Sequence, residues 1–139
     1  MKALEEGNEL QLDFTKLLKI AKTNSLVVPV VVQDADSHEV LVVAYANKEA
    51  LEHTLKTGIA TFWSTSRNEL WIKGATSGDT LQLVDIRVNC EQNSLLYVVR
   101  MLGGGVCHTK DAEGHTRKTC YYRSLKEGKL TFMKGQTSA

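Results

Sequence analysis

Two cysteines and two histidines lie in one short stretch, MLGGGVCHTKDAEGHTRKTCYYR, and a third cysteine lies in RVNCEQNSLLY. Zinc prefers thiolate and imidazole ligands, and three protein ligands leave a fourth position for a water molecule whose pKa zinc lowers to about 7. An imidazole beside the metal can then carry protons. The alternative is that these thiols are small buried hydrophobic residues, since no C-x-x-C pair is present. The candidate ligands and proton carriers are Cys90, Cys107, His108, His115 and Cys120.

A second candidate segment, WSTSRNELWIKGATSGD over residues 63–79, combines hydroxyl groups, two cations and an aromatic ring. Arg67 and Lys73 are suited to a phosphate, and Trp71 to stacking on a planar ring. Clusters of Ser, Gly and Asn are also ordinary turn chemistry, so a polar hairpin is the alternative. The segment indicates either an anionic, planar ligand or a surface hairpin.

Length and composition indicate a single globular domain. The 139 residues carry 17 basic and 16 acidic side chains, a net charge of +1, which is too balanced for the basic face that nucleic acid needs. No apolar run of about 18 residues predicts a membrane span. The acidic N-terminus has no apolar stretch of signal-peptide length, and three cysteines fit poorly with a disulfide framework. We therefore expect a cytoplasmic protein.

The first half of the chain predicts two helices around a hairpin. Residues 13–21 have Asp13 as the helix cap and apolar residues at helical spacing. Two valine-rich runs, 25–33 and 39–46, predict paired strands, and Pro29 predicts that the first is an edge strand. Residues 47–58 predict a helix with an Asn cap, a terminal Gly, and an apolar face of Ala50, Leu51 and Leu55.

The second half predicts strands and loops. Four short runs rich in β-branched and aromatic residues are bounded by turn residues, and the thirteen residues from 127 to 139 predict a frayed, flexible tail. If the last two runs pair as a hairpin, Cys90 and Cys107 can approach each other. The whole chain, 1–139, is expected to form one β-rich α+β domain with about two helices. The predicted strands are 59–65, 69–73, 80–89 and 94–101.

Taken in order, four segments resemble the phosphoribosyl-AMP cyclohydrolase family of histidine biosynthesis: PVVVQDADSHEVLVVAYANKEAL, WSTSRNELWIKGATSG, NCEQNSLLYVV, and CHT followed by CYYR. The resemblance covers about residues 26–123. It implies a small pseudo-barrel of mostly antiparallel strands in an interlocked homodimer. It also implies that Cys90, Cys107 and Cys120 bind zinc, with ligands drawn from both chains, and that His108 is the general acid/base.

The same resemblance implies a zinc-dependent hydrolase that opens the adenine ring of phosphoribosyl-AMP at the N1–C6 amidine bond. Residues that match the family motif would hold the phosphate or ribose, and Trp71 would support the ring. The substrate-binding set is Arg67, Trp71, Lys73, Thr76 and Ser77.

Departures from the family pattern concern acidic residues and one loop. The family's D-C-D-x-D magnesium motif is replaced by Asn89, Cys90, Glu91, Gln92 and Asn93. One carboxylate and two amides should hold magnesium weakly, which makes this a divergent member with a degenerate site. Another family carboxylate is replaced by Ala75. Two alternatives follow: a paralogue that keeps the fold and zinc without catalysis, or a zinc hydrolase of another cyclic amidine.

The loop between Cys107 and Cys120 is about six residues longer than the family's compact form. A longer loop can still close on zinc. His115 inside it is then available as a fourth ligand, and a site with four protein ligands would be structural instead of catalytic.

Overall fold

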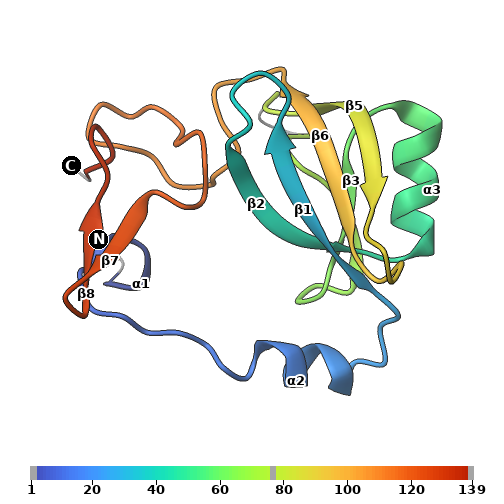
Figure 1. The fold of residues 1–139 in the computed structure, drawn as a ribbon, viewed down its shortest axis with the longest axis horizontal. Helices are drawn as coiled ribbons and strands as arrows, with labels where there is room; N and C mark the ends of the chain where they lie inside the picture. Colours follow the sequence, from blue (N-terminus) through green and yellow to red (C-terminus); the bar gives the residue numbers. More distant parts are fainter. Residues whose placement is uncertain (1–2, 76–77, 138–139) are drawn as a thin grey trace.

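The computed structural model describes residues 3–75 and 78–137, and over these it is rich in strands (Figure 1). The expected β-rich α+β class is confirmed, and the four strands predicted in the second half are present. The elements in chain order are α1 (Ala3–Glu6), α2 (Lys16–Lys22), β1 (Val28–Asp34), β2 (Val40–Ala46), α3 (Lys48–Thr57), β3 (Thr61–Ser64), β4 (Glu69–Ile72), β5 (Leu81–Val88), β6 (Leu95–Met101), β7 (Arg123–Lys126) and β8 (Lys129–Phe132).

The central sheet has the strand order β2-β1-β6-β5, and α3 packs beside it against the β3–β4 hairpin (Figure 1). The β1–β2 and β5–β6 pairs are antiparallel, whereas β1 and β6 are parallel. A parallel pair needs a long crossover connection. Here the chain from β2 through α3 and the β3–β4 hairpin to β5 forms that connection, and side chains of the hairpin pack against the core of the sheet.

The core is formed by alternate residues of these strands, because successive side chains of a strand point to opposite faces. Val30 and Val32 of β1, Leu41 of β2 and Tyr97 of β6 are fully buried. They belong to one cluster of buried residues, against which side chains of the β3–β4 hairpin also pack. The sheet and the hairpin therefore share one core.

The helix predicted over 47–58 is present, but its buried face differs from the prediction. The Asn47 side chain accepts a hydrogen bond from the Ala50 backbone nitrogen at 2.9 Å, and Gly58 ends α3 in the left-handed conformation. Ala50 is buried, but Leu55 is 64% exposed. Thr54 is buried in its place because its hydroxyl donates to the backbone oxygens of Ala50 and Thr61. A satisfied polar group thus replaces an apolar one.

The prediction that Pro29 marks an edge strand is wrong. β1 lies between β2 and β6 in the interior of the sheet. The parallel pairing with β6 begins only at Val30, one residue after the proline. Pro29 therefore stands where β1 has a neighbour on one side only, and its missing N–H is not required there.

The first predicted helix begins later than expected. α2 starts at Lys16, and the carboxylate of Asp13 accepts from the Thr15 backbone nitrogen at 2.9 Å, which closes a turn before the helix. Among the helix's own residues only Ile20 is buried, whereas Leu17 and Leu18 are 70% and 57% exposed. The expected apolar face exists in the sequence, but within one chain it lies on the surface.

The segment from residue 127, for which the sequence predicts a frayed tail, contains a strand in the structure. β7 and β8 pair as an antiparallel hairpin, and the backbone nitrogen of Ala112 donates to Thr137 at 2.8 Å. This hairpin lies beside α1, so the N-terminal and C-terminal segments meet away from the central sheet (Figure 1).

No helix among the described residues is long and apolar enough to cross a membrane.

Candidate active site

An open cavity of about 490 Å³ lies between β2, the β3–β4 hairpin and the loop that follows β6. It brings together five of the residues selected from the sequence. A second cavity adjoins it and shares four of them. The predicted residues in the first cavity wall are Arg67, Trp71, Lys73, His108 and Cys120.

The β3–β4 hairpin presents the cations and the aromatic ring to this cavity. Trp71 pairs with Phe62 across the hairpin, and the rings lie 5.6 Å apart, so packing holds the indole in place. Arg67 lies in the hairpin turn, where Asn68 has a positive φ of 57°. The Arg67 Nε lies 3.5 Å from a Glu69 carboxylate oxygen. Thr76 and Ser77, the other predicted substrate ligands, lie outside the described residues.

The loop opens with three consecutive glycines, and at two of them, Gly103 and Gly105, the backbone approaches its neighbours closely. A Cβ at Gly103 would collide with the side chain of Asp79, and one at Gly105 would lie 2.5 Å from the Arg117 carbonyl oxygen. The Gly104 nitrogen donates to Asp79 at 3.0 Å. The loop is thus held against Asp79, just before the start of β5, before it reaches Cys107.

Cys107 and Cys120 lie together at the base of the loop and share a hydrogen bond between their thiols. The Cys120 backbone nitrogen donates to the Leu41 carbonyl oxygen at 2.8 Å, which fixes Cys120 against β2. The Cys107 Sγ lies 2.9 Å from the Thr109 hydroxyl oxygen. The hydrogen bond from Cys120, aided by Thr109, lowers the pKa of Cys107 despite its burial. Two adjacent soft donors of this kind fit zinc.

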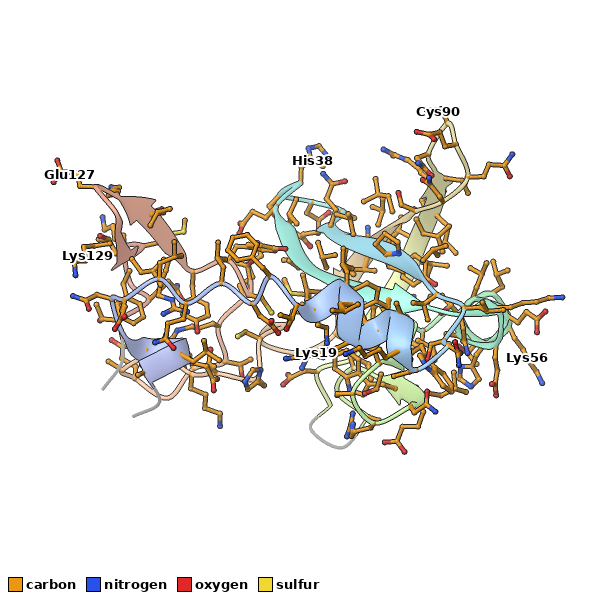
Figure 2. The ribbon with its side chains drawn as sticks, turned by 90° about the horizontal axis from the view of Figure 1, so that it is seen from below. Lys19, His38, Lys56, Cys90, Glu127 and Lys129 are labelled. Atoms are coloured by element: carbon orange, nitrogen blue, oxygen red, sulfur yellow. The ribbon has the colours of Figure 1, made fainter. Side chains whose placement is uncertain are left out.

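Cys90 does not join this pair within one chain, so the expected approach of Cys90 to Cys107 is wrong. Cys90 is exposed in the turn before β6 (Figure 2). The other two cysteines follow β6 in the chain. A strand of seven residues spans about 20 Å, so the two ends of β6 are far apart. Among the described residues no three His, Cys, Asp or Glu side chains are grouped to hold a metal ion.

His115 lies on the surface, beside acidic side chains. Its Nδ1 lies 3.5 Å from a Glu113 carboxylate oxygen and 3.8 Å from one of Asp111, and its side chain is 72% exposed. The structure therefore places His115 with these acids and apart from the thiols.

The residues at the magnesium motif close the β5–β6 turn with their amides. Asn89 Nδ2 donates to Asn93 Oδ1 at 2.6 Å, and Asn89 Oδ1 accepts from the backbone nitrogens of Asn93 and Ser94. Glu91 is exposed in the same turn. Because the Asn89 oxygen and the Asn93 oxygen are both engaged within the turn, this arrangement does not fit a magnesium ligand set.

The extended loop carries a buried arginine that no sequence pattern indicates. Arg117 is 1% exposed, and its guanidinium pairs with both carboxylate oxygens of Glu6 at 2.9 and 3.0 Å. It also donates to Thr109 Oγ1, the same hydroxyl that contacts Cys107, and to the Gln136 carbonyl oxygen. No local pattern joins positions 6 and 117, so this cluster has no signal in a single sequence.

A second residue missed from the sequence contacts the predicted general acid/base. The Glu5 carboxylate of α1 lies 2.7 Å from His108 Nε2. Both glutamates of α1 thus reach the loop that carries His108 and Cys107.

Comparison with known proteins gives a consistent assignment. The model of the family described as phosphoribosyl-AMP cyclohydrolase matches residues 42–122. The protein of that name from Desulfatibacillum aliphaticivorans is 45% identical over 82% of this chain and 86% of its own length. That from Cenarchaeum symbiosum is 48% identical over 71% of this chain and 85% of its own. The histidine biosynthesis bifunctional protein HisIE of Thermus thermophilus is 47% identical over 81% of this chain and 50% of its own length. The chain belongs to the phosphoribosyl-AMP cyclohydrolase family.

Proposed function

We propose that this enzyme opens the adenine ring of phosphoribosyl-AMP by hydrolysis at the N1–C6 bond, a step of histidine biosynthesis, and that it does so with zinc. The observation that carries the proposal is that the wall of one cavity holds two cations, an aromatic ring, an imidazole and a thiol. Family membership and the names of the relatives support the same reaction.

The cations of the β3–β4 hairpin serve to bind the substrate's phosphate. Lys73 is half-buried, and among the described residues no carboxylate forms an ion pair with it, so its charge is available to a ligand. Arg67, in the turn of the same hairpin, contributes a planar donor group. The indole of Trp71 supports the purine ring. His108, exposed at the cavity edge, carries protons to and from the reacting nitrogen.

The thiols of Cys107 and Cys120 would hold zinc, with Cys90 of a second chain as the third ligand. When bound, zinc supplies activation of the attacking water at neutral pH. Cys107 is suited to this role because its hydrogen bonds favour the thiolate form. The exposure of Cys90, at the far end of β6 from the thiol pair, favours a site completed by the partner over one closed within a chain.

A homodimer follows from this ligand arrangement and from the apolar surface of the N-terminal segment. Large apolar side chains before β1 lie exposed, and burying them against a second copy would stabilise the pair by removing them from water. They include Leu12, Phe14, Leu17, Leu18 and Leu26, which are 62%, 89%, 70%, 57% and 90% exposed.

The reaction is tested by incubating the purified protein with phosphoribosyl-AMP and zinc and following the absorbance change of ring opening. Lys73→Met should raise KM about tenfold or more, because a charge-assisted hydrogen bond to phosphate is lost. Lys56→Met is the matched control, since Lys56 is exposed on α3 outside both cavities (Figure 2). No ring opening by zinc-loaded protein would refute the activity and favour a non-catalytic paralogue or another cyclic amidine as substrate.

Sharing of zinc ligands between chains is tested by mixing two inactive variants, Cys90→Ser and the double variant Cys107→Ser/Cys120→Ser. If each site takes Cys90 from one chain and the thiol pair from the other, each mixed dimer has one complete site. Random exchange of subunits then restores about a quarter of the original activity and zinc. No recovery after the chains have been shown to exchange would refute the shared site.

A further inference from the structure

The short helix α1 reaches across the molecule to the imidazole of His108. Glu5 and His108 are 103 residues apart in the sequence, and their side-chain atoms Oε2 and Nε2 are 2.7 Å apart. The Glu5 side chain is 23% exposed and that of His108 is 79% exposed, so the carboxylate is the more firmly enclosed partner. Glu5 lies outside the segment matched by the family model.

The C-terminal segment fixes α1 from several directions. The Tyr122 hydroxyl donates to the Glu5 carbonyl oxygen at 2.8 Å. Arg123 donates to the carbonyl oxygens of Leu4 and Gly7, each at 2.9 Å. The neighbouring Glu6 is paired with buried Arg117. A four-residue helix has little stability of its own, so these contacts hold the Glu5 carboxylate where it meets His108.

We propose that Glu5 is a positioning residue that fixes the tautomer and orientation of His108, with the proton on Nε2 and the lone pair on Nδ1. An ionised carboxylate only accepts hydrogen bonds, and a neutral imidazole has one donor and one acceptor nitrogen. The nitrogen that faces Glu5 must therefore be the donor. Nδ1 is then the nitrogen that keeps its lone pair.

This assignment deepens the proposed function, because it rests on His108 acting as the acid/base of the same cavity. His108 contributes to the walls of both cavities while its Nε2 is engaged by Glu5. A base held by a third group loses little orientational freedom when the substrate binds. Loss of Glu5 should thus lower kcat and leave KM unchanged, since the residues proposed to bind the phosphate lie on the β3–β4 hairpin and not on α1.

The test combines NMR of the His108 ring with kinetics on the full chain. Nitrogen-15 spectra of the side chains, assigned by the signals lost in His108→Gln, report which ring nitrogen carries the proton. We expect a single Nε2–H tautomer in the native protein and a mixture in Glu5→Ala. Glu5→Gln keeps an acceptor oxygen and should retain most of the native pattern, and Glu9→Ala, an exposed glutamate of the same segment, should change nothing.

In the kinetic part we expect Glu5→Ala to lower kcat at least tenfold with KM changed less than twofold, the usual cost of removing a group that orients a functional histidine. In a His108→Ala background, Glu5→Ala should cause no further loss, whereas a purely structural role would add a second loss. A native tautomer that survives in Glu5→Ala would overturn the proposal, even if the enzyme is active on phosphoribosyl-AMP. A lost tautomer in a protein inactive on that substrate would support the proposal and refute only the substrate.

Discussion

Replacing Arg117 by methionine should be among the most destabilising single changes outside the central sheet. The guanidinium lies in the extended loop but contacts both ends of the chain, through the Glu6 carboxylate and the Gln136 carbonyl oxygen. It also stacks on the Tyr122 ring, with its central carbon 4.1 Å from the ring centroid. Methionine fills part of the same volume but leaves these acceptors without a donor.

The size of the effect follows from burial. The Arg117 side chain is 0% exposed and that of Glu6 is 14% exposed, so removal of the cation leaves a carboxylate and a carbonyl oxygen poorly solvated. Breaking a buried ion pair by removing one partner costs about 3–5 kcal/mol. A domain of this size has a total stability of about 5–15 kcal/mol, so the change removes a large part of it. Arg117→Lys keeps the charge without the planar fork, and should lose about half as much.

The measurement is urea unfolding followed by the fluorescence of Trp63 and Trp71, at one fixed protein concentration because a dimer's stability depends on concentration. Arg87→Met is the matched control. Arg87 pairs with Asp85 at 3.1 Å but is 65% exposed, so its loss should cost less than about 1 kcal/mol. If Arg117→Met and Arg87→Met cost the same, the loop arginine does not hold the chain ends together.

Three further changes test other parts of the structure. Hydrogen bonds from Ser37 keep the pKa of Asp34 below its ordinary value. The carboxylate therefore stabilises the fold above about pH 4, and this stabilisation is lost as the pH falls. Asp34→Asn should lower the melting temperature at pH 7 and make the melting temperature decline less steeply in acid. Asn47→Ala removes the α3 cap and should cost about 1 kcal/mol in urea unfolding, with equal stability refuting the cap. Asn89→Asp with Asn93→Asp replaces a 2.6 Å amide hydrogen bond by two carboxylates, so the variant's melting temperature should rise on adding magnesium. The melting temperature of the native protein should not rise on adding magnesium. A rise would contradict a turn closed by the amides of Asn89 and Asn93.

Much of the secondary structure could be predicted from the chain because its signals are local. The short apolar runs of β1, β2 and β6 and the cap and terminal glycine of α3 depend on neighbours a few residues away. The errors at Pro29 and Leu55 concern which element packs beside a strand or a helix. That packing depends on residues far away in the sequence, so a few neighbouring residues do not indicate it. The β7–β8 hairpin was missed because short polar strands at a chain end resemble a frayed segment.

The same distinction applies to the candidate site. Residue types in the sequence indicated five candidate site residues, Arg67, Trp71, Lys73, His108 and Cys120. One cavity brings all five together. The partners of these residues come from tertiary structure: α1 and the last strands close around the loop, so that positions separated by more than a hundred residues meet. The separation of Cys90 from the other thiols depends on β6 lying between them. Side-chain chemistry is a property of each residue, whereas the distance between two residues far apart in the sequence is decided only by how the whole chain packs.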